Sequence, residues 1–244
     1  INILCPGNVT GNAAADECGA NMTVPAPVVT DPCGAVFIVN NYNNTSNASG
    51  YYPVGITTVI WSISDASGNT DTCMQTVTVT DTQAPNISCP GDQSFTAPPP
   101  DCQLVVNAVT SPVLSDNCDV ADLILSFVLT GATTGSGTGS VNGTSFNVGA
   151  TIVTYTVTDS SGNAASCSFT ITINDQVPPT IIDCPDDISV AADPGACGTS
   201  ITIPAPVVSD PCNEVVNITN SFNGTGNASG YYPVGITTVT WTVT

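Results

Sequence analysis

The chain has 244 residues, of which 41% are apolar, and it contains 21 glycines and 19 prolines but no apolar periodicity of helix length. It has no Lys, Arg or His against 19 acidic residues, so its formal net charge is −19. Phosphate binding depends on cationic side chains, so nucleic acid is excluded as a partner, and ion pairs between side chains are excluded too. The fold must therefore rest on apolar burial, backbone pairing and cross-links.

In the first part of the chain we expect strands over residues 8–12, 20–29, 35–42, 57–64 and 73–80. Apolar residues at alternate positions lie on one face of a strand, here Val59, Trp61 and Ile63. The loop at 65–69 contains an Asp and a Gly that let the chain reverse, so this stretch predicts a hairpin. Pro25 and Pro27 cannot donate ladder hydrogen bonds, so the second strand is interrupted there or lies at an edge.

The hairpin is repeated further along the chain. It returns at residues 144–173 and begins again at residue 230. The second repeat also carries a run rich in Gly, Thr and Ser at 131–140, which we interpret as a longer flexible hairpin tip. The joins at 81–85 and 175–179 are short and contain proline, which favours semi-rigid spacers. We therefore expect three units, at 1–82, 83–176 and 177–244.

Eleven cysteines recur at matched places in these units, with a period of about 90 residues, the size of a small β-sandwich. This usage indicates an oxidising compartment and not a zinc site, which needs closely spaced pairs. No run of about 18 apolar residues could span a membrane. Ile1 does not begin a signal peptide, so we expect a processed or excerpted part of an exported protein, extracellular or at the cell surface.

The order of the motifs resembles the hyalin repeat, or HYR, domain. Each unit has an early Cys-Pro, a Cys before an apolar strand and an Asp-Pro-Cys or Asp-Asn-Cys turn, and the first two continue into a G-x-T-x-V to D-x-S-G-N block. The resemblance covers nearly the whole chain and implies an all-β fold of tandem immunoglobulin-like sandwiches in a linear rod. The four-cysteine type is similar to repeats of secreted bacterial surface proteins. The third unit departs from the pattern because it lacks the D-x-S-G-N loop, the fourth cysteine and the last strand.

The resemblance also implies a disulfide pairing, because the first and last strands of such a sandwich run parallel and start at the same end. The expected pairs are Cys5–Cys73, Cys89–Cys167, Cys18–Cys33, Cys102–Cys118 and Cys197–Cys212. Cys184 is left without a partner in the chain, since its mate belongs to the missing strand. Four cysteines allow three pairings, so the alternatives stay open.

Catalysis is not expected, because the absent residue types remove most acid–base and covalent mechanisms, and repeated Asp residues in turns indicate architecture. No cofactor is expected. Calcium has candidate oxygen ligands in loops and near the joins, at Asp65, Asp81, Asp159 and Asp175. We favour the alternative that these residues form Asx turns. Trp61 and Trp241 are interpreted as core residues and not as a sugar-binding platform.

Ten Asn-x-Ser/Thr sequons occur, and several cluster in the tip that precedes each repeated hairpin, where a glycan would be tolerated. The glycosylation candidates are Asn43, Asn44, Asn47, Asn142, Asn223 and Asn227.

Two functions remain. The first is an extracellular structural protein, a segment of a disulfide-stapled rod or filament with a surface or adhesive role, whose partners are other copies or further repeats. The alternative is a glycan- or protein-binding adhesion module acting through its loop tips. The first and third units keep the same tip sequence, which favours the structural role. The strand missing from the third unit would come from continuation of the polypeptide, which we favour, or from another subunit by β-addition.

Overall fold

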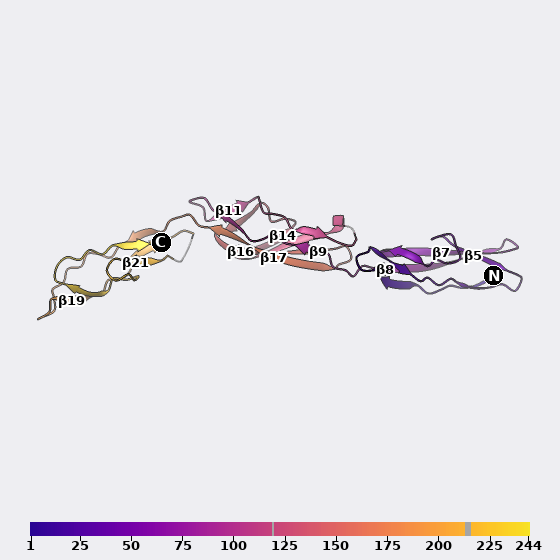
Figure 1. The fold of residues 1–244 in the computed structure, drawn as a ribbon, viewed down its shortest axis with the longest axis horizontal. Coiled ribbons are helices and arrows are strands. Elements are labelled where there is room, and N and C mark those ends of the chain that lie inside the picture. The colour runs from indigo at the N-terminus through magenta and orange to yellow at the C-terminus, as the bar shows by residue number, and fades with distance from the viewer. Residues whose placement is uncertain (119, 213–215) are drawn as a thin grey trace.

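The computed structural model describes residues 1–118, 120–212 and 216–244. Its strands form three groups that follow one another in an elongated row, with the N-terminal group at one end and the C-terminal group at the other (Figure 1). Apart from a 3-10 turn at Val120–Asp122 (η1), the regular elements of the described residues are β-strands. The expected all-β fold of tandem sandwiches is confirmed.

The first unit consists of β1 to β8. A four-stranded sheet has the order β2-β8-β7-β5, in which β2 runs parallel to β8, while β1 pairs with β4 and β3 with β6. The expected second strand is divided into β3 and β4 on either side of the two prolines, and β1 and β6 are strands that the sequence did not predict. The bounds are β1 Asn2–Leu4, β2 Val9–Asn12, β3 Gly19–Met22, β4 Val28–Thr30, β5 Val36–Asn40, β6 Gly50–Pro53, β7 Gly55–Asp65 and β8 Thr70–Thr80.

The second unit repeats this plan with one additional strand. Its sheet has the order β10-β17-β16-β13-β14, and β11 pairs with β15 and β12 with β9. The run at 131–140 is not a flexible tip, because Gly135–Thr138 (β14) pairs with β13 and extends the sheet. The other bounds are β9 Asn86–Ser88, β10 Gln93–Thr96, β11 Gln103–Val106, β12 Val113–Ser115, β13 Ile124–Gly131, β15 Thr144–Asn147, β16 Gly149–Thr158 and β17 Ala164–Asn174.

The third unit has three two-stranded pairs among its described residues: β18 with β20, β19 with β22 and β21 with β23. These correspond in order to β1 with β4, β3 with β6 and β5 with β7 of the first unit. The bounds are β18 Thr180–Asp183, β19 Gly198–Ile201, β20 Val207–Ser209, β21 Ile218–Asn220, β22 Gly230–Pro233 and β23 Trp241–Val243. Trp241 is partly exposed, so it is less deeply packed than the alternation of the sequence predicts.

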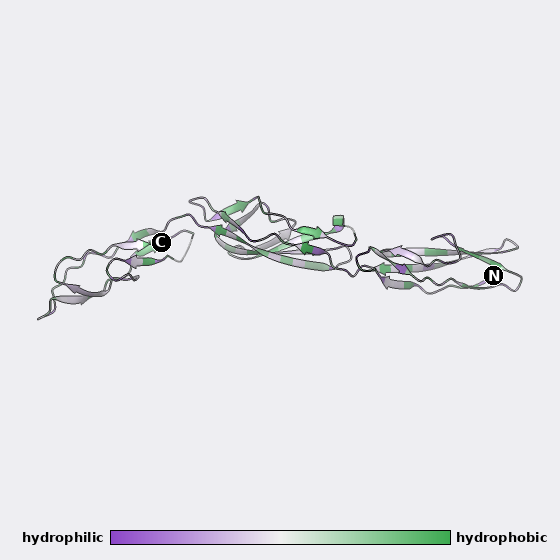
Figure 2. Ribbon diagram, viewed as in Figure 1, coloured by the Kyte–Doolittle hydropathy of each residue, from purple (hydrophilic) through white to green (hydrophobic). Residues whose placement is uncertain are grey.

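Each of the first two units has its own core. In the first, Trp61 is fully buried, and its indole N–H donates to Oε1 of the buried Gln75 at 3.2 Å. Tyr52, also fully buried, stacks on Tyr42 and donates its hydroxyl to the Ala48 carbonyl oxygen at 2.7 Å. Apolar residues recur along the strands of all three units (Figure 2). The alternation of buried and exposed positions in β7 and β8 follows the period of two expected from the sequence.

Candidate functional site

The joins between consecutive units carry the most distinctive chemistry of the chain. The structure contains two disulfides within units, Cys5–Cys73 and Cys89–Cys167, which are the pairs implied for the first and last strands. Two further disulfides connect different units. Cys18 is bonded to Cys118, with Cα atoms 4.6 Å apart, and Cys102 is bonded to Cys212, with Cα atoms 4.9 Å apart.

The expected Cys18–Cys33 pair is wrong, because these residues lie at opposite ends of the first unit. The carbonyl oxygen of Cys18 accepts a hydrogen bond of 3.1 Å from the N–H of Val54, just before β7 begins. Cys33 precedes β5, whose first residue, Val36, pairs with Asp65 at the other end of β7. The 11 residues of β7 extend over roughly 35 Å, far beyond the Cα separation of about 7 Å that a disulfide tolerates.

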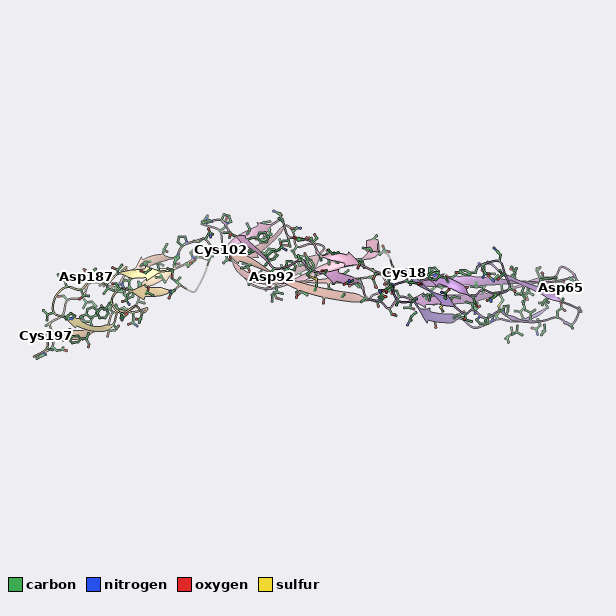
Figure 3. The ribbon with its side chains drawn as sticks, in the orientation of Figure 1. Cys18, Asp65, Asp92, Cys102, Asp187 and Cys197 are labelled. Carbon is green, nitrogen blue, oxygen red and sulfur yellow. A yellow bond between two sulfur atoms is a disulfide. The ribbon has the colours of Figure 1, made fainter. Side chains whose placement is uncertain are left out.

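The expected Cys102–Cys118 and Cys197–Cys212 pairs fail for the same reason. The carbonyl oxygen of Cys102 accepts a hydrogen bond of 2.9 Å from the N–H of Val148, which directly precedes the long strand β16. Cys18 makes the same contact in the first unit. Figure 3 shows the labelled Cys18, Cys102 and Cys197 at the same end of their respective units. The second cysteine of one unit therefore meets the third cysteine of the next unit across each join.

Polar contacts reinforce the first join. The Asn117 side chain donates through Nδ2 to the carbonyl oxygen of Glu17 at 3.1 Å and to Oδ1 of Asp81 at 3.2 Å. Asn163, in the D-x-S-G-N loop of the second unit, donates through Nδ2 to the Asp81 carbonyl oxygen at 3.2 Å. Within the linker, Oε1 of Gln83 accepts from the N–H of Asp16 in the first unit at 2.9 Å. The two units are thus connected by the linker, a disulfide and a set of hydrogen bonds.

The first join also contains buried oxygens without a hydrogen-bond partner among the described residues, namely Oδ1 of Asp116 and Oδ1 of Asn117. Ligand atoms of Asp81, Asp116 and Cys118 lie within 4.8 Å of one another. The sulfur of Cys118 is held in a disulfide, so the atoms that could bind a cation here are oxygens, the kind that calcium prefers.

The second join repeats the disulfide, Cys102–Cys212. Ligand atoms of Asp175, Asp210 and Cys212 again lie within 4.8 Å of one another. Pro211 occupies the position that Asn117 has in the first join, and Val177 the position of Gln83, so the side-chain donors of the first join have no counterparts at these two positions.

The four calcium candidates all accept hydrogen bonds from backbone N–H groups two to four residues later in the chain. Asp65, Asp81 and Asp175 accept from the residue two positions on, which is the geometry of Asx turns. Asp81 accepts from Gln83 at 3.0 Å and Asp175 from Val177 at 2.8 Å. Asp65 and Asp159 accept from the Asn at the end of their loops, at 2.9 and 2.8 Å. The side-chain hydrogen bond from Asn69, followed by that from its backbone N–H, lowers the pKa of Asp65 below its ordinary value. Only Asp81 and Asp159 of these four are buried, at 3% and 6% exposure.

The glycosylation candidates lie at exposed positions. In the first tip, Asn43 and Asn47 belong to a local network in which Nδ2 of Asn43 donates to the Asn47 carbonyl oxygen at 2.8 Å. Asn44 has a left-handed backbone, with φ of 60°. In the third unit, Asn223 donates to the Ser229 carbonyl oxygen at 3.3 Å, and Oδ1 of Asn227 accepts from the N–H of the same serine.

Asn142 has a structural role in the second unit, since its side chain makes both hydrogen bonds to the backbone of Val109, at 2.8 and 3.1 Å.

Sequence reasoning placed the calcium candidates Asp81 and Asp175 near the joins but missed the bridges there, because the cysteines were paired within each unit. The third cysteine of each unit lies in an Asp-x-Cys turn, a pattern that does not say whether its partner belongs to the same unit or to a neighbour. In that turn the Asp carboxylate accepts from the cysteine N–H, at 3.1 Å for Cys118 and 2.9 Å for Cys212. The sequence did not indicate the contacts of Asn117 or the hydrogen bond between Gln83 and Asp16, because isolated amide side chains are common in loops.

Comparison with known proteins places the chain among repeat proteins. The chain is 30% identical over 250 residues to hyalin of Strongylocentrotus purpuratus, covering 98% of this chain and 19% of the hyalin. It is 28% identical over 245 residues to hyalin of Lytechinus variegatus, covering 99% of this chain and 42% of that protein. The chain thus spans less than half the length of either relative. Both are animal proteins, so the similarity to bacterial repeats stays a prediction.

Among solved structures, human CDH23 EC21-23 aligns with a TM-score of 0.38 and 12% identity, covering 96% of this chain and 89% of that one. Mouse cadherin-23 EC22-24 aligns with a TM-score of 0.37 and 12% identity, covering 93% and 86%.

No helix among the described residues is long and apolar enough to cross a membrane. Four disulfides indicate an oxidising environment, and the protein is extracellular or located at the cell surface. A model of the HYR domain matches residues 2–79 and again 80–173. The chain therefore belongs to the HYR domain family.

Proposed function

We propose that this chain is a segment of a disulfide-stapled extracellular rod or filament, built from tandem HYR sandwiches and serving a structural or adhesive role on a surface without catalysis. The third group of strands is included as a further HYR sandwich. The observation that supports the proposal is the pair of disulfides that cross the two joins, Cys18–Cys118 and Cys102–Cys212.

A covalent bond across a join changes its mechanics. Units connected by a linker alone can swing in all directions about that linker. A second covalent connection confines the relative motion to rotation about the line through the two tethers. At the first join Asn117 donates beside the disulfide, to Glu17 and Asp81, and Asn163 donates to Asp81 at the start of the linker, so these hydrogen bonds restrain that rotation as well. Such joints suit a load-bearing spacer, and a module that binds through its tips does not require them.

Small-angle X-ray scattering of the native chain and of a variant without inter-unit bridges tests this role. The variant carries Cys→Ser substitutions at both pairs, in a background where the free cysteines Cys33, Cys184 and Cys197 are also Ser. We expect a stiff, elongated particle for the background chain and a broad, flexible distribution of distances for the variant. Equal flexibility of the two chains would contradict the proposal.

The alternative function, recognition of a glycan or protein by the loop tips, has one supporting observation. The tips of the first and third units hold the same polar network, in which Asn40 or Asn220 donates to the Asn three residues later at 3.0 or 2.8 Å. Tyr51 and Tyr231 are about half exposed beside these tips, at 45% and 54%. Binding of the fluorescently labelled chain to a glycan array, abolished by Tyr51→Ala together with Tyr231→Ala, would favour this role over the rod. Attachment of N-glycans at the exposed sequons stays a prediction that mass spectrometry of the native protein can check.

Calcium at the first join is also a proposal. Asp81, Asp116 and Asn117 supply at least three oxygens, two of them buried without a hydrogen-bond partner in the described part of the chain. Calcium takes about six to eight oxygen ligands, so water would complete the shell. Calorimetric titration with calcium should release heat with the native chain and none with Asp116→Asn. Absence of heat with the native chain would contradict the proposal.

A further inference from the structure

The two joins follow the same plan but differ in the residues that make their polar contacts. Each has a short linker and one disulfide, Cys18–Cys118 in the first join and Cys102–Cys212 in the second. Two such connections leave one rotation free, about the line that runs from the linker to the disulfide. Whether that rotation is blocked depends on the hydrogen bonds around these two connections.

In the first join, hydrogen bonds fasten the linker and the disulfide region to the first unit and to each other. Oε1 of Gln83, in the linker, accepts from the N–H of Asp16 at 2.9 Å, and Nε2 of Gln83 donates to Oδ1 of Asp16 at 3.2 Å. Asn117, beside the disulfide, donates to the carbonyl oxygen of Glu17 at 3.1 Å and to Oδ1 of Asp81 at 3.2 Å. Rotation of one unit against the other would break these contacts.

The contact between Asp16 and Gln83 cannot form in the second join, because both partners are replaced. Asp16 stands two residues before the second cysteine of its unit, and the matching position of the next unit is Pro100, which has no N–H to donate. Gln83 stands two residues after the Asp that begins the linker, and the matching residue is Val177, whose side chain neither donates nor accepts hydrogen bonds. The linker of the second join therefore lacks this attachment.

The contacts of Asn117 are lost in the same way. Pro211 directly precedes the bonded cysteine of the second join, as Asn117 does in the first, and its ring offers no donor. The acceptor is kept, because Asp175 occupies the position of Asp81. The second join thus retains both covalent connections without the side chains that lock the first. The third unit is also tilted away from the line of the first two (Figure 1).

We propose that the second join is a hinge that turns about the line through its linker and its disulfide, and that the first join is the locked form of the same joint. The inference rests on the proposed rod and assigns its bending to one join. A linker alone would let the third unit swing in all directions, whereas a hinge with two tethers lets it move in one plane. The rod therefore stays elongated while its third unit changes direction.

Residual dipolar couplings of the backbone amides, measured by NMR in a dilute aligning medium, test this directly. Units that move as one body share one alignment tensor, and a unit on a hinge shows a tensor of smaller magnitude. The full chain is used with the free cysteines Cys33, Cys184 and Cys197 replaced by Ser, and with EDTA so that calcium adds no lock. The couplings of each unit are first fitted to its own structure, which shows that the unit is folded. We expect equal tensors for the first and second units and a smaller one for the third.

Two variants exchange the properties of the joins and leave both disulfides in place. The locking variant carries Pro100→Asp, Val177→Gln and Pro211→Asn, and its third unit should take the tensor of the second unit. The unlocking variant carries Gln83→Val and Asn117→Ala, and the tensors of its first and second units should become unequal.

Equal tensors for all three units of the starting chain, or a third unit that stays weakly aligned in the locking variant, would overturn the inference. If the third unit of the locking variant does not fit its own structure, the unlocking variant decides, and equal tensors for its first two units would overturn the inference. Failure of the rod gives a different result. Unequal tensors for the first and second units of the starting chain would mean that the first join is not stiff, and the proposed function then fails first.

Discussion

Removal of the first inter-unit disulfide should destabilise the first unit, although that unit keeps its own disulfide and core. Cys18 and Cys118 are 100 residues apart in sequence. Restricting a loop of that length in the unfolded chain is worth about 4.7 kcal/mol in the chain-entropy model. If the first unit unfolds alone, the loop runs only from Cys18 to β9, which begins at Asn86. That shorter loop of roughly 68 residues still gives about 4.4 kcal/mol.

Measured effects of disulfide removal are usually smaller than this model predicts, so we expect Cys18→Ala with Cys118→Ala to cost the first unit about 2–4 kcal/mol. Tryptophan fluorescence can follow this unit selectively. The chain has two tryptophans, and Trp61 lies fully buried in the first core. In a Trp241→Phe background, with the three free cysteines replaced by Ser, urea unfolding observed by fluorescence reports the first unit alone. The midpoint should fall by on the order of 1 M urea or more.

The second inter-unit bridge provides the matched control. Cys102→Ala with Cys212→Ala removes the same chemistry from the other join, so the Trp61 transition should keep its midpoint. An unchanged midpoint in the Cys18 and Cys118 variant, or an equal fall in the control, would refute the reasoning.

Three further predictions concern the first unit and the first join. Burial raises the pKa of Tyr52 from 10.0 to about 12, so the folded state keeps a proton that the unfolded chain releases. This contribution to stability is complete below pH 10 and is lost as pH rises to about 12, which lowers the free energy of unfolding by about 2–3 kcal/mol. Urea unfolding at increasing alkaline pH, with the thiols blocked, should show this loss in the native chain and not in Tyr52→Phe. Gly19→Ala should cost about 1–3 kcal/mol, because a Cβ there meets the Tyr52 carbonyl oxygen, whereas Gly7→Ala meets nothing within 4 Å and should be neutral by the same fluorescence assay. Asn117→Ala removes two hydrogen bonds at the first join and should lower the free energy of opening that join by about 1 kcal/mol. Faster backbone hydrogen exchange in residues 81–85 would measure this change.

The hairpin of β7 and β8 was predictable because its information is local. Alternating apolar residues and a reversing loop specify which face is buried, and the parallel pairing of β2 with β8 then brings Cys5 to Cys73. The interruption at Pro25 and Pro27 was predictable for the same reason, since proline removes a ladder donor wherever it stands.

The bridge between Cys18 and Cys118 depends on the placement of one unit against another, for which a repeat pattern holds no local signal. Matched cysteines are equally compatible with bridges inside each unit and with bridges between neighbours. What separates the two is the length of β7, which keeps Cys18 and Cys33 apart. The strand at Gly135–Thr138 was missed because its Gly, Thr and Ser composition is typical of loops, while its pairing is supplied by the neighbouring strand β13.

The central claim is that the bridges connect neighbouring units, and peptide mapping without reduction tests it directly. Trypsin cannot cut a chain that has no Lys or Arg, but cleavage before Asp places every cysteine on a separate peptide. After the free thiols are blocked with N-ethylmaleimide, we expect peptide 16–30 joined to 116–118 and peptide 101–115 joined to 210–244. Recovery of peptide 16–30 joined to 31–64, the bridge between Cys18 and Cys33, would contradict the account.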